Sequence, residues 1–100
     1  MRTYLKQTED EFIVTAELPG FSKDDLKVKI TEDSVAISVD KKKIAIEKGK
    51  NFYREESSYG SMSEHFTLPL RVEANKSKIE FRNGILEIII PKKKKVSLKK

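Results

Sequence analysis

The sequence predicts a single all-β domain built as an antiparallel β-sandwich. Seven or eight short segments alternate between apolar and polar residues at spacings of about ten residues, with proline, glycine or polar clusters between them. No stretch has the apolar periodicity of an amphipathic helix. A chain of 100 residues fits one domain, and at this size it buries roughly 60–70% of its unfolded surface, so we expect a thin core.

The first half of the chain carries the clearest strand patterns. In residues 12–18 every second side chain is apolar and lies on one face, and Pro19-Gly20 ends the strand. Residues 26–31 and 35–39 alternate strictly around a short polar turn, which predicts an antiparallel pair with one solvated face. The strands expected in this half are residues 2–7, 12–18, 26–31 and 35–39.

The middle of the chain is more polar, and its pattern is weaker. Residues 40–51 are expected to form a charged connection with a hinge at Gly49. Residues 52–59 suggest an irregular strand that Gly60 breaks, and residues 62–68 suggest a further strand.

The strongest local signal is a β-hairpin centred on Asn83-Gly84. Both residues tolerate the positive φ angles of a two-residue hairpin turn, and an alternating run precedes them at residues 79–82. The returning run, residues 85–90, is apolar on both faces, so we expect this strand to be covered on both sides. Pro91 ends the ladder because it has no N–H to donate.

The net charge of +5 originates at the end of the chain. Residues 92–100 hold six lysines and no acid, and the rest of the chain holds 15 basic and 16 acidic residues. The basic balance therefore describes a tail rather than the surface of the domain. We expect residues 1–91 to form the domain and residues 92–100 to form a lysine-rich, solvated C-terminal tail.

Composition argues against several classes of protein. The chain has no cysteine, so disulfides and thiolate metal sites are excluded, and a reducing, cytoplasmic location is the expectation. No apolar run reaches the roughly 18–20 residues of a membrane span, and no signal-peptide core follows Met1. No phosphate loop, nucleophile elbow or metal cluster accompanies the carboxylates, and His65 has no identifiable catalytic partner. We therefore expect no enzyme and no cofactor.

Three motifs in a fixed order resemble a known family. Residues 16–21 read Ala-Glu-Leu-Pro-Gly-Phe, residues 66–69 read Phe-Thr-Leu-Pro, and residues 83–86 read Asn-Gly-Ile-Leu ahead of Ile90-Pro91-Lys92. Together they resemble the α-crystallin domain of small heat shock proteins of the microbial or plant kind, over about residues 2–92. The resemblance implies an immunoglobulin-like sandwich and the ATP-independent holding of unfolding client proteins.

The resemblance also implies how copies of the chain associate. In this branch of the family a long loop carries a strand to a partner, so residues 51–58 would pair with residues 2–7 of the other chain in a homodimer. A short C-terminal motif docks in a groove at the edge of a neighbouring domain and builds higher homo-oligomers. The implied residues are Tyr4, Leu5, Phe52, Tyr53, Arg54 and Glu55 for strand exchange, Val96 and Leu98 for the docking motif, and Leu26, Val28, Ile30 and Ile79 for the groove. The residues of the predicted groove can equally be simple core, and the motif can equally be part of a loose tail.

The chain departs from the family pattern at identifiable positions. Glu64 stands where an arginine is common, and Ile79 stands where alanine is usual. Glu64 has inward parity on its strand, so its carboxylate needs a partner that the sequence does not identify. The tail motif is Val-x-Leu, and the first strand begins close to Met1, where the family usually has a long apolar arm. The chain is then either a cut-down core or an unusually short member.

Two other functions compete with the chaperone hypothesis. A co-chaperone adaptor of the CS type shares the sandwich and binds a folded partner, but such domains usually lack a long connection such as residues 40–51. A nucleic-acid module would bind through the lysine tail, with a steep dependence on salt and no specific sequence.

Overall fold

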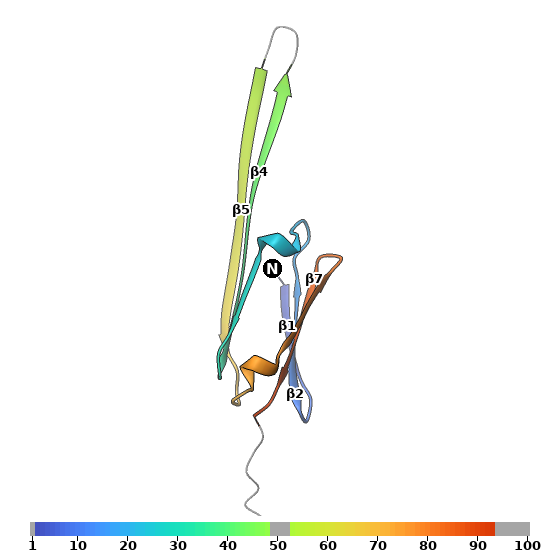
Figure 1. The fold of residues 1–100 in the computed structure, drawn as a ribbon, viewed down its shortest axis with the longest axis vertical. Coiled ribbons are helices and arrows are strands. Elements are labelled where there is room, and N and C mark those ends of the chain that lie inside the picture. The colour runs from blue at the N-terminus through green and yellow to red at the C-terminus, as the bar shows by residue number, and fades with distance from the viewer. Residues whose placement is uncertain (1, 49–52, 94–100) are drawn as a thin grey trace, which may run out of the picture.

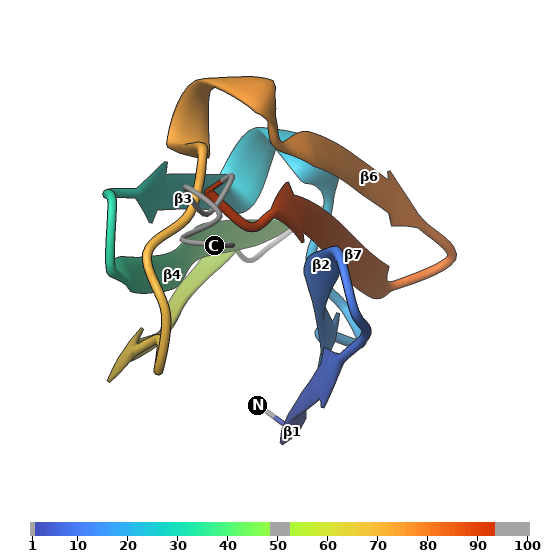
Figure 2. The same ribbon diagram turned by 90° about the horizontal axis from the view of Figure 1, so that it is seen from below.

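The protein folds as two antiparallel sheets stacked face to face (Figures 1 and 2). The structure is a computed structural model that describes the backbone of residues 2–48 and 53–93 and the side chains of residues 2–41 and 60–93. One sheet has the strand order β1-β2-β7-β6 and the other has the order β3-β4-β5. The predicted all-β antiparallel sandwich is confirmed.

Seven strands and two short 3-10 turns make up the described part of the chain. The strands are β1 (Arg2–Gln7), β2 (Glu11–Glu17), β3 (Leu26–Ile30), β4 (Ser34–Lys48), β5 (Tyr53–Thr67), β6 (Lys78–Arg82) and β7 (Ile85–Pro91). The turn η1 (Lys23–Asp25) leads into β3, and η2 (Ala74–Lys76) precedes β6. Figure 2 shows β3 and β6 at one lateral edge of the sandwich and β5 and β1 at the other.

The core lies between the sheets and follows the alternation of the strands. In β2 and β7 every second residue is buried, and the residues between them are half-buried or exposed on the outer face. The buried apolar side chains are Phe12, Val14, Ala16, Leu18, Val35, Ile37, Val39, Leu68, Val72, Leu86, Ile88 and Ile90. The pairing of β2 with β7 places Val14 beside Ile88, so the centre of the four-stranded sheet is its most apolar part.

The hairpin between β6 and β7 turns at Asn83-Gly84, as predicted. Asn83 has φ 53° and Gly84 has φ 77°, the left-handed values that a type I′ turn requires at both central positions. The Gly84 carbonyl accepts a hydrogen bond from the Leu18 amide at 2.7 Å. This bond ties the hairpin to the end of β2.

The structure differs from the expected connection over residues 40–51. Residues 40–48 continue β4, and each pairs with a residue of β5, from Asp40 opposite Ser61 to Lys48 opposite Tyr53. The two strands form a long hairpin that extends beyond the sandwich (Figure 1). A hairpin ladder forms through the pairing of backbone groups, and the alternation of apolar side chains that marks a buried strand is not required for it. The expected hinge, Gly49, lies outside the described residues.

Gly60 does not break the strand that contains it, so that prediction is wrong. β5 runs without interruption from Tyr53 to Thr67, and Gly60 pairs with Lys41. A Cβ atom built on Gly60 would lie 3.9 Å from Cζ of Phe21, an ordinary contact. The strand therefore passes close to the tip of the Phe21 ring at Gly60.

The outer face of the β3-β4-β5 sheet carries mostly small polar side chains over its described residues. Ser34, Ala36, Ser38 and Asp40 alternate with buried residues along β4. The exposed residues of β5 on the same face are Ser61, Ser63, His65 and Thr67. Lys27 and Lys29 line its β3 edge. We call this surface the hydroxyl face.

Candidate functional site

The edge strand β1 presents two of the residues predicted for strand exchange. Tyr4 is 49% exposed and Leu5 is 45% exposed. Leu5 pairs with buried Val14 and so shares its inward face, whereas Tyr4 lies on the outer face beside Thr15. Among the described strands only β2 pairs with β1, so the other side of β1 has backbone groups open to a further strand.

Glu64 reaches across the open side of the sandwich to β1. Its Oε1 atom accepts a hydrogen bond from Oγ1 of Thr3 at 2.5 Å. Glu64 is half-buried and faces inward, because its neighbour in β4 is the buried Ile37. The predicted need for a partner is met by a hydroxyl from the opposite sheet. This bond links β5 to β1 at the edge where exchange is expected.

The predicted exchange segment lies in the hairpin arm, defined here as residues 41–48 and 53–60. The backbone of Tyr53, Arg54 and Glu55 belongs to β5 and pairs with β4 of the same chain, and Phe52 lies outside the described residues. At the foot of the arm Nζ of Lys41 donates a hydrogen bond to the Gly20 carbonyl at 2.5 Å. The arm is therefore anchored to the turn after β2.

The residues predicted for a groove lie along the β3 and β6 edges. Leu26, Val28 and Ile30 are partly buried and pack on the core, as their alternation indicates. Ile79 is 48% exposed although it pairs with buried Ile88, because β6 is the last strand of its sheet. The two sets share one lateral edge of the sandwich (Figure 2). Docking of a tail or client there stays a prediction.

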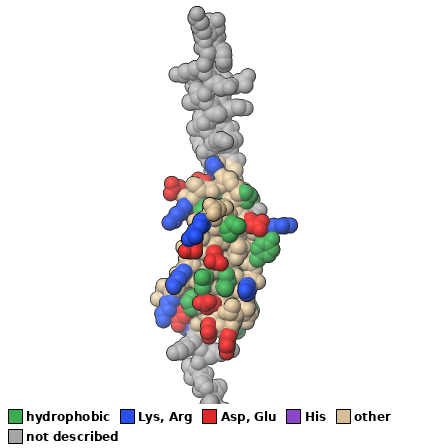
Figure 3. All heavy atoms as spheres, turned by 90° about the vertical axis from the view of Figure 1, so that its right-hand side faces the viewer, with side chains coloured by type: hydrophobic (Ala, Val, Ile, Leu, Met, Phe, Trp, Pro, Cys, Tyr) green, Lys and Arg blue, Asp and Glu red, His purple; other side chains and the backbone are tan. Residues whose placement is uncertain are grey.

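The outer face of the four-stranded sheet mixes apolar and charged side chains (Figure 3). Ile13 and Ile89 pair at its centre, and Lys6 and Lys78 lie beside them on the outer strands. The next row across the sheet carries Glu87 paired with Glu80. Charged residues therefore separate the apolar ones, and Figure 3 shows scattered apolar spots rather than one continuous patch.

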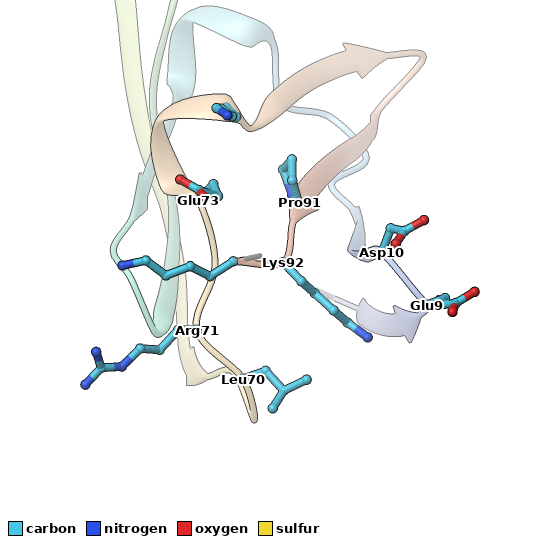
Figure 4. Close-up of a pocket in the computed structure, with 9 residues that line it drawn as sticks. Glu9, Asp10, Leu70, Arg71, Glu73, Pro91 and Lys92 are labelled. Carbon is cyan, nitrogen blue, oxygen red and sulfur yellow. The ribbon is translucent and has the colours of Figure 1, made fainter. Parts of the chain in front are cut away.

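A hollow of about 780 Å³ lies at the end of the sandwich where β7 ends (Figure 4). Its walls come from the β1–β2 turn, the connection between β5 and β6, and the end of β7. The lining residues are Glu9, Asp10, Leu70, Arg71, Glu73, Lys76, Pro91, Lys92 and Lys93. None of the residues predicted for the groove belongs to this hollow. Val96 and Leu98, the predicted docking motif, lie outside the described residues.

The side chains that the structure describes do not form a metal-binding cluster. His65 is exposed on the hydroxyl face, and no group of three or more His, Cys, Asp or Glu residues is placed to hold a metal ion among the side chains of residues 2–41 and 60–93. Within the same residues, no helix has the length and apolar character needed to cross a membrane.

Sequence reasoning missed two sets of residues that organise these regions. Thr3 carries no signal of its own, because its partner Glu64 is 61 positions away. Lys92 and Lys93 looked like the start of a solvated tail, yet their amides donate to the carbonyls of Asp10 and Arg71 at 2.8 and 2.9 Å. The one available signal was Pro91, which marks the end of a strand but not the end of the packed chain.

Comparison with known proteins gives a consistent result. The model of the Hsp20/alpha crystallin family matches residues 4–100. The chain is 33% identical over 96 residues to spore protein SP21 of Stigmatella aurantiaca, covering 96% of this chain and 57% of that protein. It is 34% identical over 99 residues to small heat shock protein C4 of Rickettsia felis, covering 99% of this chain and 61% of the relative. The chain thus spans about three fifths of the length of these curated relatives.

The fold also matches the solved structure of a small heat-shock protein. A small heat-shock protein from Xylella fastidiosa superimposes with a TM-score of 0.71 at 25% sequence identity, covering 99% of this chain and 91% of that one. The family match extends over the sandwich, the β1 edge and the hairpin arm. The chain therefore belongs to the Hsp20/alpha crystallin family.

Proposed function

We propose that this protein is an ATP-independent holdase chaperone that binds unfolding proteins and keeps them from aggregating. The observation that carries the proposal is the match of residues 4–100 to the Hsp20/alpha crystallin family, whose relatives include proteins named as small heat shock proteins. The exposed apolar side chains of the β1 and β6 edges support it. Leu5 and Ile79 are among the large apolar residues left exposed on the described surface.

A holdase requires reversible exposure of apolar surface rather than a reacting group. Edge strands supply this, because their unpaired N–H and C=O groups accept an extended segment while neighbouring side chains contact its apolar residues. The β1 and β6 edges combine both features in one small domain. Unfolding proteins expose extended apolar segments of the type that such edges bind.

We further propose that two copies form a dimer by exchange of the hairpin arm. The arm projects beyond the sandwich, and β1 leaves one side unpaired (Figure 1). Tyr53, Arg54 and Glu55 of one copy would pair with the Tyr4–Leu5 edge of the other. Copies of the same chain always have matching lengths of arm and edge, which favours self-association over pairing with unrelated strands.

The Val96–Leu98 motif would dock on the edge formed by Leu26, Val28, Ile30 and Ile79 of a neighbouring copy. Burying two aliphatic side chains contributes roughly 1.5–3 kcal/mol each before the cost of ordering the segment. The net stabilisation is then small, and docking is weak and reversible. Such a cover exposes the apolar edge readily when clients accumulate.

The holdase proposal is tested by heating an aggregation-prone reporter enzyme with increasing amounts of this protein in the absence of ATP. Light scattering would report aggregation, and an unrelated β-sandwich domain at equal mass serves as the control. We expect suppression that saturates near stoichiometric ratios. Scattering that matches the control at every ratio would contradict the proposal.

The exchange proposal is tested by shortening the hairpin arm. Lys41 and Gly60 face each other in the register, so replacing residues 42–59 with Asn-Gly closes the hairpin at its foot. We expect a dimer for the full chain and a monomer for the shortened chain by light scattering, with unchanged β-sheet circular dichroism. A shortened chain that remains dimeric would refute exchange through the arm. A monomeric full chain without holdase activity would favour the CS-type adaptor instead.

A further inference from the structure

The first two residues after β7 are packed against the sandwich. The Lys92 amide donates to the Asp10 carbonyl at 2.8 Å, and the Lys93 amide donates to the Arg71 carbonyl at 2.9 Å. Between these bonds the Pro91 carbonyl accepts from the Glu73 amide at 2.8 Å. The chain is therefore held from two sides at the point where the C-terminal segment begins.

The side chain of Lys92 folds back onto the domain. Its Nζ atom donates to the Thr8 carbonyl at 2.6 Å and lies 5.3 Å from the centroid of the buried Phe12 ring. A lysine in this position is bound both by the carbonyl and by the negative face of the ring. Figure 4 shows the Lys92 side chain pointing toward the β1–β2 turn, where Glu9 and Asp10 lie.

The side chain of Lys93 reaches to the opposite side, to the turn between β3 and β4. Its Nζ atom lies 2.5 Å from Oε2 of Glu32, and Arg71 places a second cation 3.8 Å from the same oxygen. The backbone of Glu32 is bound as well, because its carbonyl accepts from the Val72 amide at 2.8 Å. One carboxylate thus joins the β3–β4 turn, the β5–β6 connection and the end of the chain.

We propose that Lys92 and Lys93 are positioning residues, and that Glu32, Arg71 and Lys93 form an ionic latch that fixes where the C-terminal segment leaves the sandwich. The lysine run is then not uniform: its first two members belong to the fold, and the segment starts at residue 94. The proposal rests on the proposed tail docking only for its effect on assembly.

The latch limits the distance from the domain that the Val96–Leu98 motif can reach. From a fixed Lys93, an extended chain of three residues carries Val96 at most about 11 Å away. Release of Lys93 and Lys92 moves the fixed point back to Pro91 and lengthens this reach by about 7 Å. A shorter tether raises the effective concentration of the motif near its own exit point and favours docking on a neighbour in contact with this end of the domain.

Salt is expected to weaken this latch. The Glu32–Arg71–Lys93 group lies at the surface, with about half of the Glu32 and Lys93 side chains exposed, so dissolved ions screen its attraction. The Lys92 contacts are less sensitive, because a carbonyl and a buried ring hold that side chain. Rising ionic strength therefore releases Lys93 before Lys92.

The test is amide hydrogen exchange of Lys93 in the full-length protein, measured by mass spectrometry with residue-resolved fragmentation. In Glu32→Gln the Lys93 amide is expected to exchange about two- to fivefold faster than in the wild type. Lys93→Gln removes the same contact from the other side and should accelerate the same amide. High salt should accelerate hydrogen exchange of the Lys93 amide in the wild type but have little effect on it in either variant.

The matched control is Glu80→Gln, which removes an exposed carboxylate 3.7 Å from Arg82, on β6 and away from the exit. It should leave Lys93 exchange unchanged. The double variant Glu32→Lys with Lys93→Glu, which swaps the two charges, should restore most of the protection of the amide at position 93 against hydrogen exchange. Unchanged Lys93 exchange in Glu32→Gln, or equal acceleration in Glu80→Gln, would overturn the latch.

The same variants separate the latch from the proposed function. Exchange at Lys93 requires neither a dimer nor a client, so it reports on the latch alone. If Glu32→Gln accelerates exchange and also shifts the assembly mass by light scattering, both the latch and tail docking are supported. If exchange accelerates while the mass stays constant, the latch stands and assembly does not depend on it; tail docking itself is refuted if removing residues 94–100 also leaves the mass unchanged.

Discussion

Thr3 and Glu64 form the contact between the sheets at the β1 edge, and this bond is open to direct measurement. Thr3→Val keeps the shape of the side chain but leaves the half-buried Glu64 carboxylate without its donor at 2.5 Å. We expect a loss of about 1.5 kcal/mol in the free energy of unfolding, the low end of the range for a hydrogen bond to a charged group, because Glu64 is only half-buried. Urea titration followed by circular dichroism measures it.

The control for that experiment is Thr15→Val, on the outer face of β2. It makes the same chemical change away from Glu64 and should alter stability by less than about 0.5 kcal/mol. Equal effects of the two substitutions would show that the Thr3–Glu64 bond contributes nothing beyond the general cost of replacing a hydroxyl.

Glu32 gives the fold a dependence on acid. The hydrogen bond from Lys93, its charge and that of Arg71 hold the pKa of Glu32 below its ordinary value of 4.5. A carboxylate whose pKa is lowered by folding stabilises the fold when the pH is above the pKa of the unfolded chain. This contribution disappears as the pH falls through the lowered pKa of the folded protein. We expect the wild type to be more stable than Glu32→Gln at pH 7 and the difference to vanish at the acid end of a thermal series.

The residue scale is where sequence reasoning was weakest. The inward parity of Glu64 was readable from its strand, but Thr3 lies 61 positions away on a strand of the other sheet. The lysines at 92 and 93 resemble those that follow, and only the positions of Glu32, Thr8 and Phe12 in space distinguish them. Contacts between distant segments leave no pattern in the local sequence.

At the level of elements, the β6–β7 hairpin depends on its glycine. Gly84 has φ 77°, and a Cβ atom there would also lie 3.6 Å from the Leu18 carbonyl oxygen. Gly84→Ala should lower stability by about 1–2 kcal/mol, the cost of a left-handed conformation for a residue with a side chain. Thermal unfolding measures the loss. Gly60→Ala, in extended backbone with room for a methyl group, should cost much less, and a comparable loss there would contradict the argument.

The central strand β7 supplies the second test at this scale. Ile88 is fully buried, whereas its neighbour Ile89 is half-buried on the outer face. Ile88→Ala should cost about 2–5 kcal/mol, since it removes buried methyl groups and leaves a cavity. Ile89→Ala should cost clearly less in the same urea titration. Similar losses would mean that β7 is covered equally on both faces.

Elements with a strong apolar alternation were predictable, and those without one were not. Residues 26–39 alternate because one face is buried, and the Asn83-Gly84 turn needs residues that accept positive φ. Residues 40–48 carry mixed charges and read as a connection, yet backbone pairing with residues 53–61 makes them a strand. Gly60 was misread for the same reason, because backbone pairing carries the strand through it.

For the molecule as a whole, we expect most of the net positive charge to be removable without loss of the fold. Residues 94–100 contain four lysines and no acid, so removing them lowers the net charge from +5 to +1. We expect the truncated protein to elute from a cation exchanger at distinctly lower salt, with an unchanged unfolding midpoint. Elution at the same salt would place the basic character on the domain surface instead. A lower midpoint would show that this segment contributes to the fold.

The hydroxyl face limits the directions in which copies of the chain can associate. Over the described residues its outward side chains on β4 and β5 are serines, a threonine, a histidine, an aspartate and Ala36, with lysines along the β3 border. Such a surface keeps its water and offers no aliphatic side chain larger than a methyl group, so stacking two copies through it gains little. Aggregated or assembled material would then extend sideways through strand edges and leave one wetted side, which favours sheets and shells over dense, three-dimensional precipitates.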